Sequence, residues 1–327
     1  MPEIEIVTAA ARLAALAEPW WELWRKSRGA TVFQNPGWLI PWWDAFAPGG
    51  LETVAVWDEG RLVALAPLYL EDGPLGRRLL PLGIGISDHL DLLLMPDNPD
   101  AAAALERALA ALPLAWESLE LEEMLPGASA LTLPPLAGAA ESLAPQSACP
   151  AVTLNGETDA SGLPMAVPAK RRQFFRRSAR RVDDGRAEEP ATMAFLEILE
   201  ALHAARWAAR EEPGVLADPR VGIFHRLALP GLRDAGLARL TMARVGGKPA
   251  AALYQLCWGD QLATYIGGFD PAFAAASPLS FLIGDAFIHA SRQGMHRVDF
   301  LRGRESYKYH WGAADVWNCR RSFRRTQ

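Results

Sequence analysis

The chain has little of what marks several common protein classes. Its 327 residues include only three cysteines, Cys149, Cys257 and Cys319. An odd and widely spaced set does not build a disulfide scaffold. No apolar run reaches the roughly 20 residues that a bilayer crossing requires. The N-terminus carries Glu3 and Glu5 and lacks the basic segment and apolar run of a secretory leader. We therefore expect a globular protein of the cytoplasm with no membrane span.

Signatures of several enzyme classes are also missing. The sequence has no Walker A loop, no Gly-rich dinucleotide fingerprint and no recognisable order of a Ser-His-Asp triad. Its six histidines show no metal-ligand spacing. The tightest group, Asp88-His89-x-Asp91, fits a hydrogen-bonded loop better than a metal site. We therefore predict no metal cofactor.

The chain contains a repeated order of secondary-structure patterns. Alternating apolar residues around Asp58-Glu59-Gly60 and around Gly246-Gly247 predict two hairpins. Each hairpin follows a helical pattern, and each is followed by a strand, a helix and a further strand. The predicted elements are helix 36–46, strands 53–57, 61–70 and 89–95, helix 100–112 and strand 118–122; then helix 224–235, strands 239–245, 248–258 and 261–267, helix 278–293 and strand 297–301.

This order predicts an α/β fold of two similar units, each with a mixed β-sheet flanked by helices. Residues 1–135 form the first predicted unit and residues 169–327 the second. Residues 136–168 are rich in Pro, Ala, Gly and Ser and show little periodicity. That composition is typical of a linker.

The most informative stretch is residues 299–312, Asp-Phe-Leu-Arg-Gly-Arg-Glu-Ser-Tyr-Lys-Tyr-His-Trp-Gly. Acid, base and hydroxyl side chains crowd in this way where a strand ends at a site of chemistry. The stretch resembles the Asp-Phe-x-x-Gly…Tyr-Lys…Trp-Gly ending of the CelD-like acetyltransferases. Those proteins belong to the GNAT (N-acetyltransferase) superfamily and are relatives of the FemAB aminoacyltransferases. Residues 33–38, Phe-Gln-Asn-Pro-Gly-Trp, also resemble a segment near the start of CelD-like proteins.

The resemblance implies tandem GNAT-like units, of which the second is the better candidate for the active one. It further implies transfer of an acyl group from a thioester, on CoA (acetyl-CoA) or an acyl carrier, to an amine. The acceptor would be a small molecule or a precursor of the envelope or of a polysaccharide. Two alternatives stay open: a FemAB-like transferase that uses aminoacyl-tRNA, and a non-catalytic accessory protein for polysaccharide export.

GNAT-type enzymes hold the cofactor pyrophosphate where a helix follows their fourth strand. That strand corresponds to 262–267, and the helix begins at Ser277, which can act as a cap before Pro278. The resemblance therefore implies cofactor-binding roles for Gly267, Gly268, Ser277 and Ser280. The sequence departs from the usual GNAT pattern here, because residues 269–276 lack the Arg/Gln-x-x-Gly-x-Gly/Ala loop. This departure leaves the donor open between CoA, carrier protein and tRNA.

Three catalytic candidates lie in the motif. Asp299 could orient the acceptor amine or accept its proton through water. Tyr307 stands where GNAT-type enzymes often place the acid that protonates the leaving thiolate, and Lys308 could bind a phosphate or pair with Asp299. An extended motif would place Tyr307 and Lys308 on opposite faces.

A basic segment precedes the second unit. Residues 170–186 carry eight Lys or Arg and two Asp, although the whole chain has a net charge of −5. Arginine suits phosphate recognition, so we predict that Arg176, Arg177 and Arg180 bind an anionic acceptor or partner, with tRNA as the only nucleic acid under consideration. Tyr265, in a central strand, could line the acceptor cleft.

Overall fold

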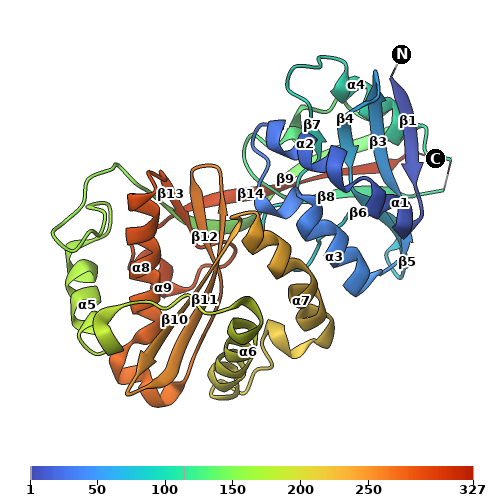
Figure 1. Cartoon of the computed structure of the whole chain (residues 1–327). Coiled ribbons are helices and arrows are strands. Elements are labelled where there is room, and N and C mark those ends of the chain that lie inside the picture. Colours follow the sequence, from blue (N-terminus) through green and yellow to red (C-terminus); the bar gives the residue numbers. More distant parts are fainter. Residues whose placement is uncertain (1, 114, 327) are drawn as a thin grey trace. The chain divides into compact units, whose positions relative to one another are not determined.

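A computed structural model describes residues 2–113 and 115–326, which form two compact units (Figure 1). The first unit comprises Met1–Ser147 and Trp317–Gln327, and the second comprises Ala148–Val316. The last residues of the chain therefore belong to the first unit. None of the described helices has the length and apolar character that a membrane crossing needs.

The first unit has two groups of hydrogen-bonded strands. One has the order β1-β3-β4-β7 and the other β14-β8-β6-β5-β2. The bounds are β1 Glu3–Val7, β2 Gly50–Leu51, β3 Thr53–Asp58, β4 Arg61–Ala66, β5 Leu68–Gly73, β6 Gly76–Pro81, β7 Leu93–Leu94, β8 Ser118–Met124 and β14 Ala314–Arg325. The helices are α1 Ala10–Ala15, α2 Ala17–Lys26, α3 Pro36–Phe46 and α4 Ala101–Ala110. Fully buried Trp20 and Trp38 anchor α2 and α3 in the core.

The second unit is built on the strand order β10-β11-β12-β13-β9. Its strands are β9 Ala139–Thr153, of which residues 148–153 belong to this unit, β10 Ala238–Val245, β11 Lys248–Trp258, β12 Gln261–Phe269 and β13 Arg297–Asp299. Its helices are α5 Ala169–Ala179, α6 Thr192–Ala208, α7 Pro219–Asp234, α8 Pro278–Arg292 and α9 Ser306–Tyr309. Short 3₁₀ turns lie at Val32–Gln34, Ser129–Thr132, Asp183–Gly185, Val215–Ala217 and Pro271–Ala276.

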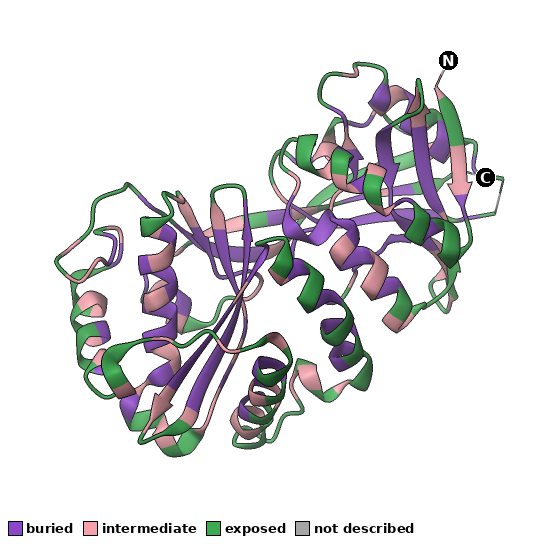
Figure 2. Ribbon diagram, in the orientation of Figure 1, coloured by how far each residue is buried: buried purple, intermediate pink, exposed green. Residues whose placement is uncertain are grey.

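Helices cover both faces of this sheet. α8, with α5 outside it, packs on one face, and α6 and α7 pack on the other (Figure 1). The inner side of α8 is almost wholly buried, and the strands beneath it are buried on both faces (Figure 2). The ring of Phe175 stacks on Phe281, with centroids 5.6 Å apart. A Cβ on Gly284 would lie 2.2 Å from the Phe175 ring. Gly284 therefore lets α5 pack close to α8.

The predicted fold class, a mixed α/β fold with helix-flanked sheets, is confirmed. Helix 36–46 and strand 248–258 have the predicted bounds. The predicted strand 61–70 is divided into β4 and β5, because Pro67 between them has no N–H for a strand ladder. Residues 139–153, within the segment expected to be a linker, form β9.

One predicted strand is mostly wrong. Of residues 89–95 only Leu93–Leu94 are a strand. The side chain of Asp91 accepts the backbone N–H groups of Ser129 and Ala130, at 2.7 and 2.8 Å. These side-chain hydrogen bonds fix a loop where the apolar pattern predicts a strand ladder.

Candidate functional site

Two parallel strands of the second unit diverge. β12 pairs with β13 only over residues 261–263 and 297–299. β13 then ends at Asp299, while β12 continues to Phe269. Among the described residues, β12 therefore has no strand partner on this side beyond Ala263. Ligands of α/β sheets bind where neighbouring parallel strands separate at their carboxyl ends.

A β-bulge lies on β12 at the same point. Tyr254 of β11 is opposite Ile266, and Gln255 is opposite Thr264, so Tyr265 is the extra residue on β12. Bulges bend a strand and redirect its groups, and they are common beside active sites. The bulge comes directly before Ile266 and Gly267, at the open side of β12.

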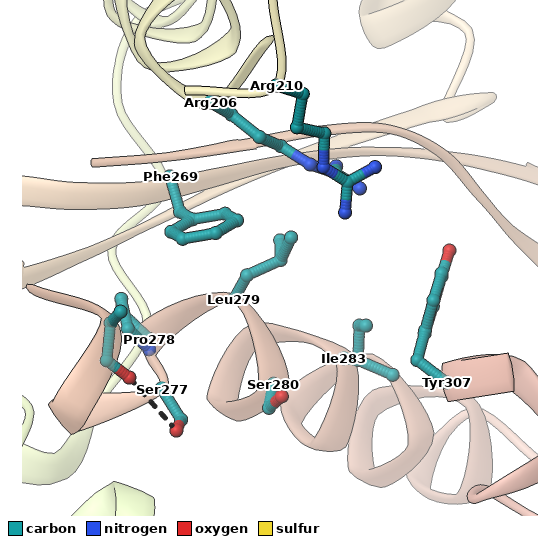
Figure 3. A pocket seen from close by; sticks show the side chains of 10 residues that line it. Arg206, Arg210, Phe269, Ser277, Pro278, Leu279, Ser280, Ile283 and Tyr307 are labelled. Atoms are coloured by element: carbon teal, nitrogen blue, oxygen red, sulfur yellow. Dashed lines mark hydrogen bonds between the residues drawn. The ribbon is translucent and has the colours of Figure 1, made fainter. Parts of the chain in front are cut away.

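A cavity of about 260 Å³ lies against the part of β12 that extends beyond β13, where Phe269 lines it (Figure 3). Helix α8 supplies one wall with its first two turns, and the end of α6 supplies the opposite wall. Tyr307 reaches into the cavity from α9 (Figure 3). The lining residues are Arg206, Arg210, Phe269, Ala274, Ser277, Pro278, Leu279, Ser280, Ile283 and Tyr307.

The cavity is positively charged, because Arg206 and Arg210 line it and no carboxylate does. Arg206 Nη1 donates a hydrogen bond to the carbonyl oxygen of Gly267, at 2.8 Å. Its guanidinium also lies 5.6 Å from the Trp207 ring and 5.8 Å from the Phe269 ring. Burial lowers the pKa of Arg206 from its ordinary value, which is far enough above neutrality for the group to stay charged.

The hydroxyl of Tyr307 is protonated at neutral pH. Burial, reinforced by the charge of Glu305, raises the pKa of Tyr307 to about 12. Arg206 acts in the opposite direction with a smaller effect. A phenol of this kind can donate a proton but is a poor base at neutral pH.

The first turn of α8 is also part of the wall. Ser277, the residue before the helix, adopts a left-handed conformation with φ 54°, and Pro278 occupies the first helical position. No side chain in the described part of the chain caps this turn. From α5, Arg171 Nη2 donates to Ser280 Oγ at 3.2 Å. An uncapped helix start next to arginine is favourable for an anion such as phosphate.

The three catalytic candidates of the motif do not converge on the cavity. Residues 306–309 form a helix and not an extended segment. Tyr307 lines the cavity, whereas Asp299 and Lys308 do not. Asp299 is 1% exposed and accepts from Arg297 Nη2 and from the backbone N–H of Leu301, each at 2.7 Å. Lys308 is 2% exposed and donates to the backbone carbonyls of residues 301, 302 and 303, at 3.1, 2.6 and 3.0 Å.

The predicted cofactor-binding residues fall into two groups. Ser277 and Ser280 line the cavity. Gly267 and Gly268 have packing roles: a Cβ on Gly268 would lie 2.6 Å from the backbone nitrogen of His203 in α6, and one on Gly267 would lie 3.0 Å from Leu279. The missing side chains let helices pack closely against β12.

The predicted acceptor-binding residues lie outside this cavity. Arg176 pairs with Asp159 at 3.0 Å, and Arg177 and Arg180 are exposed on or just after α5. The Tyr265 ring packs against Tyr254, with centroids 5.3 Å apart. A second cavity, of about 380 Å³, lies beside α5 and is lined by Pro168, Lys170, Arg171, Phe174, Tyr309 and His310.

Sequence reasoning missed Arg206 and Arg210, because it missed α6. The signal was present. Buried Phe195, Leu199 and Leu202 recur at helical spacing within 192–208.

Comparison with known proteins agrees with this architecture. Residues 169–309 match the family described as acetyltransferase (GNAT) domain. No curated protein matches the sequence.

Several solved structures share the fold. FemX superposes with a TM-score of 0.66 at 10% identity, covering 98% of this chain and 96% of FemX. A protein of unknown function from Bacteroides thetaiotaomicron gives 0.63 at 12% identity, covering 99% of this chain and 100% of its own. The C-terminal domain of a protein from Agrobacterium fabrum assigned as a lysylphosphatidylglycerol synthetase gives 0.59 at 13% identity, covering 97% and 92%. At these identities the likeness is one of fold.

Proposed function

We propose that this chain, as a GNAT-type N-acyltransferase, moves an acyl group from a thioester donor to an amine. Its acetyltransferase domain spans residues 169–309. The proposed reaction takes place in the cavity at the β12–β13 divergence. The observation that carries the proposal is the position of Tyr307. Its protonated hydroxyl lies in one cavity with the uncapped start of α8 and the free side of β12. Acyl transfer to an amine needs an acid, an anion site and a donor to the carbonyl oxygen within such a space.

The residues of the cavity fit an acyl-CoA or the phosphopantetheine arm of a carrier protein. Ser280 and the first turn of α8 would hold phosphate oxygens, and Arg171, which lines the second cavity and donates to Ser280, would add positive charge beside them. Leu279, Ile283 and Phe269 provide an apolar wall for the thioester arm. When bound, the donor supplies an activated acyl carbon and a thiolate leaving group.

Two groups of the chain would act on the reaction directly. The N–H and C=O of a strand residue point to the same side of the strand, and the C=O of Gly267 faces Arg206. The Gly267 N–H is therefore suited to donate to the carbonyl oxygen as negative charge develops there. Tyr307 would give its proton to the departing thiolate.

Asp299 and Lys308 receive a positioning role in this proposal. Both bind backbone groups of the segment 301–303 that leads to α9. They would hold Tyr307 at its place in the cavity without touching the substrates.

A second candidate is transfer from aminoacyl-tRNA. Its support is the similarity to FemX, together with Arg177 and Arg180 exposed beside a GNAT domain. The third candidate, a non-catalytic accessory protein for polysaccharide export, has no specific support in the cavity. We place the reaction in the cytoplasm, and we propose an acceptor that is a small amine or a precursor of the envelope or of a polysaccharide.

Calorimetry and thermal shift with the full chain separate these candidates. Acetyl-CoA, longer acyl-CoAs, acylated carrier protein and aminoacyl-tRNA are titrated separately. A ligand at 100 times its dissociation constant should stabilise the protein by about 2.7 kcal/mol. Two results together support the proposal: a thioester donor binds, and the protein releases thiol from it. The Tyr307→Phe variant should abolish this thiol release. Binding of aminoacyl-tRNA alone, lost in Arg177→Gln/Arg180→Gln, would replace the proposal with the second candidate, and no binding of any donor would support the third.

A further inference from the structure

We propose that Arg206 and Arg210 form an acceptor subsite, and that the acceptor is a small amine carrying an anionic oxygen group, carboxylate or phosphate, a few bonds from its nitrogen. This inference rests on the proposed function, since it names the class of acceptor for the same cavity. Two cationic side chains on one wall, with no carboxylate in the lining, are the observation that carries it.

The guanidinium of Arg206 has unused hydrogen-bonding capacity. It makes one hydrogen bond, to Gly267, and its Nε–H is buried with no partner among the described residues. Glu305, whose charge acts on Arg206, does not line the cavity and pairs with Lys308 Nζ at 2.9 Å. Arg206 is half-buried, so part of its hydration is lost without a carboxylate to replace it, and an anionic ligand would offset that cost.

The protein holds Arg206 and Arg210 in place without neutralising them. Both guanidinium groups lie over the ring of Trp207, at 5.6 and 5.4 Å, and Arg206 also lies near Phe269. The aromatic contacts and the bond to Gly267 fix the guanidinium of Arg206, while the exposed Arg210 is held against Trp207, and both keep N–H donors available. A preorganised guanidinium suits bidentate binding of carboxylate or phosphate.

The arginines lie at the acceptor end of the cavity. Arg206 comes from the end of α6 and Arg210 from the turn that follows it, and the start of α8, which suits the donor phosphates, lies at the other side (Figure 3). Leu279 and Phe269 lie between the two polar ends in this view (Figure 3). Arg171, which lines the second cavity, donates to Ser280 beside the donor end. One anion at each end is the arrangement that an acyl transfer between two anionic substrates requires.

The position of Gly267 sets the length of the acceptor. Arg206 is 2.8 Å from the carbonyl oxygen of the residue whose N–H would bind the reacting carbonyl. An anion held by Arg206 is therefore close to the acyl carbon. An amine attached by a short linker would reach that carbon, and a neutral amine would lose this anchor.

The test compares matched amines on the full chain. Glycine is compared with glycinamide, and O-phosphoethanolamine with ethanolamine, so each pair differs in the anion. Binding is measured by ligand-observed NMR with no donor present. Thiol release is measured with acetyl-CoA, and acetyl-CoA affinity is measured separately by calorimetry. The variants are Arg206→Gln and Arg210→Gln. The matched control is Arg226→Gln, which removes a partly exposed arginine on α7 that pairs with Glu200 outside the cavity.

We expect the wild type to prefer one anionic amine over its neutral partner by about 10- to 100-fold, the range for a charge-assisted hydrogen-bonded pair. Each cavity variant should remove most of this preference and leave acetyl-CoA affinity unchanged, and Arg226→Gln should preserve both. The pair that shows the preference identifies the anion as carboxylate or phosphate. Equal binding of anionic and neutral amines would overturn the inference. The inference would also be overturned if the arginine variants lost affinity for acetyl-CoA and kept their affinity for the amine. That result would assign the arginines to the donor site. Arginine-dependent binding of an anionic amine without thiol release from any donor would sustain the inference and count against the proposed acyl transfer.

Discussion

Lys308 Nζ donates to the carbonyl oxygen of Leu301 at 3.1 Å, across the segment that connects β13 to α9. Leu301 has a left-handed backbone with φ 58°, which is unfavourable for a residue with a branched side chain. The same ammonium binds the next two carbonyls and pairs with Glu305 at 2.9 Å. Lys308 therefore holds together the turn that presents Tyr307 to the cavity.

Lys308→Met should lower the free energy of unfolding by about 2–4 kcal/mol, because it leaves buried carbonyl groups without a donor. Urea unfolding measures the change. Lys248→Met is the control, since Lys248 is exposed beside a turn and its loss should cost no more than about 0.5 kcal/mol. A Lys308→Met protein of normal stability but without turnover would instead assign Lys308 a catalytic role.

Tyr307→Phe removes only the hydroxyl that we propose as the acid. Turnover should fall about 10²–10⁴-fold, with donor affinity unchanged, if the proton is given in the transition state. Because the pKa of Tyr307 is about 12, above the ordinary value for tyrosine, its hydroxyl should stay protonated at neutral and mildly alkaline pH. Ionisation of Tyr307 should therefore not lower the wild-type rate until the pH approaches 12.

Steady-state rates from pH 7 to 10.5 check this prediction. Tyr309→Phe is the matched control, because the Tyr309 hydroxyl donates to Asp315 at 2.7 Å and does not line the 260 Å³ cavity. Near-normal turnover in Tyr307→Phe would remove Tyr307 from the mechanism.

The sequence predicts the central strands and α8 of the second unit well because the signals there are local. The almost wholly apolar run from Pro249 to Trp258, next to the Gly246-Gly247 turn, is sufficient to define β11. Ser277-Pro278 marks the start of α8 to within one residue. Each of these elements depends on residues adjacent in the sequence, so no knowledge of the tertiary structure is required.

The site is less predictable because it depends on contacts between distant segments. Arg206 from α6, Leu279 from α8 and Tyr307 from α9 meet only in the folded unit. The motif itself gives no sign that Lys308 turns inward to bind carbonyls, since a lysine next to a tyrosine fits a catalytic role equally well. Burial and hydrogen-bond partners separate these roles, and both are tertiary properties.

The two adjacent glycines of β12 should differ sharply in their tolerance of a side chain. A Cβ at Gly268 would meet backbone atoms of α6, at 2.6 Å from His203 N, whereas a Cβ at Gly267 would meet the flexible end of Leu279 at 3.0 Å. Gly268→Ala should therefore destabilise the protein by about 2–3 kcal/mol and Gly267→Ala by less, as expected for overpacking against rigid and movable neighbours.

Thermal unfolding of the two variants, side by side, measures the difference. Equal stability of both would mean that α6 can shift away from β12. In that case the position of Arg206, which comes from the same helix, would not be fixed by this packing.

Acid should destabilise the second unit through His225. Burial, with a smaller effect of Arg226, lowers the pKa of His225 to about 3, against an unfolded value of about 6.5. Between these values the unfolded chain binds a proton that the folded chain does not, so stability rises with pH. The contribution is complete above pH 6.5 and is lost as the pH falls toward 3. From pH 6.5 to 5 the loss from this residue should be about 2 kcal/mol.

Urea unfolding at pH 6.5 and pH 5, for the wild type and His225→Phe, isolates this residue. Subtracting the change in unfolding free energy of the variant from that of the wild type cancels the contributions of the other titrating groups. These include His203, whose pKa is lowered by burial to about 4, and Asp91, whose pKa is raised by burial to about 6. Asp91 acts with the opposite sign, because a raised carboxyl pKa adds stability as pH falls through it. The His225→Phe protein should lose less stability on acidification than the wild type. An equal loss in both would mean that His225 takes up its proton in the folded protein, against the direction that its burial among Phe224, Tyr254 and Tyr265 predicts.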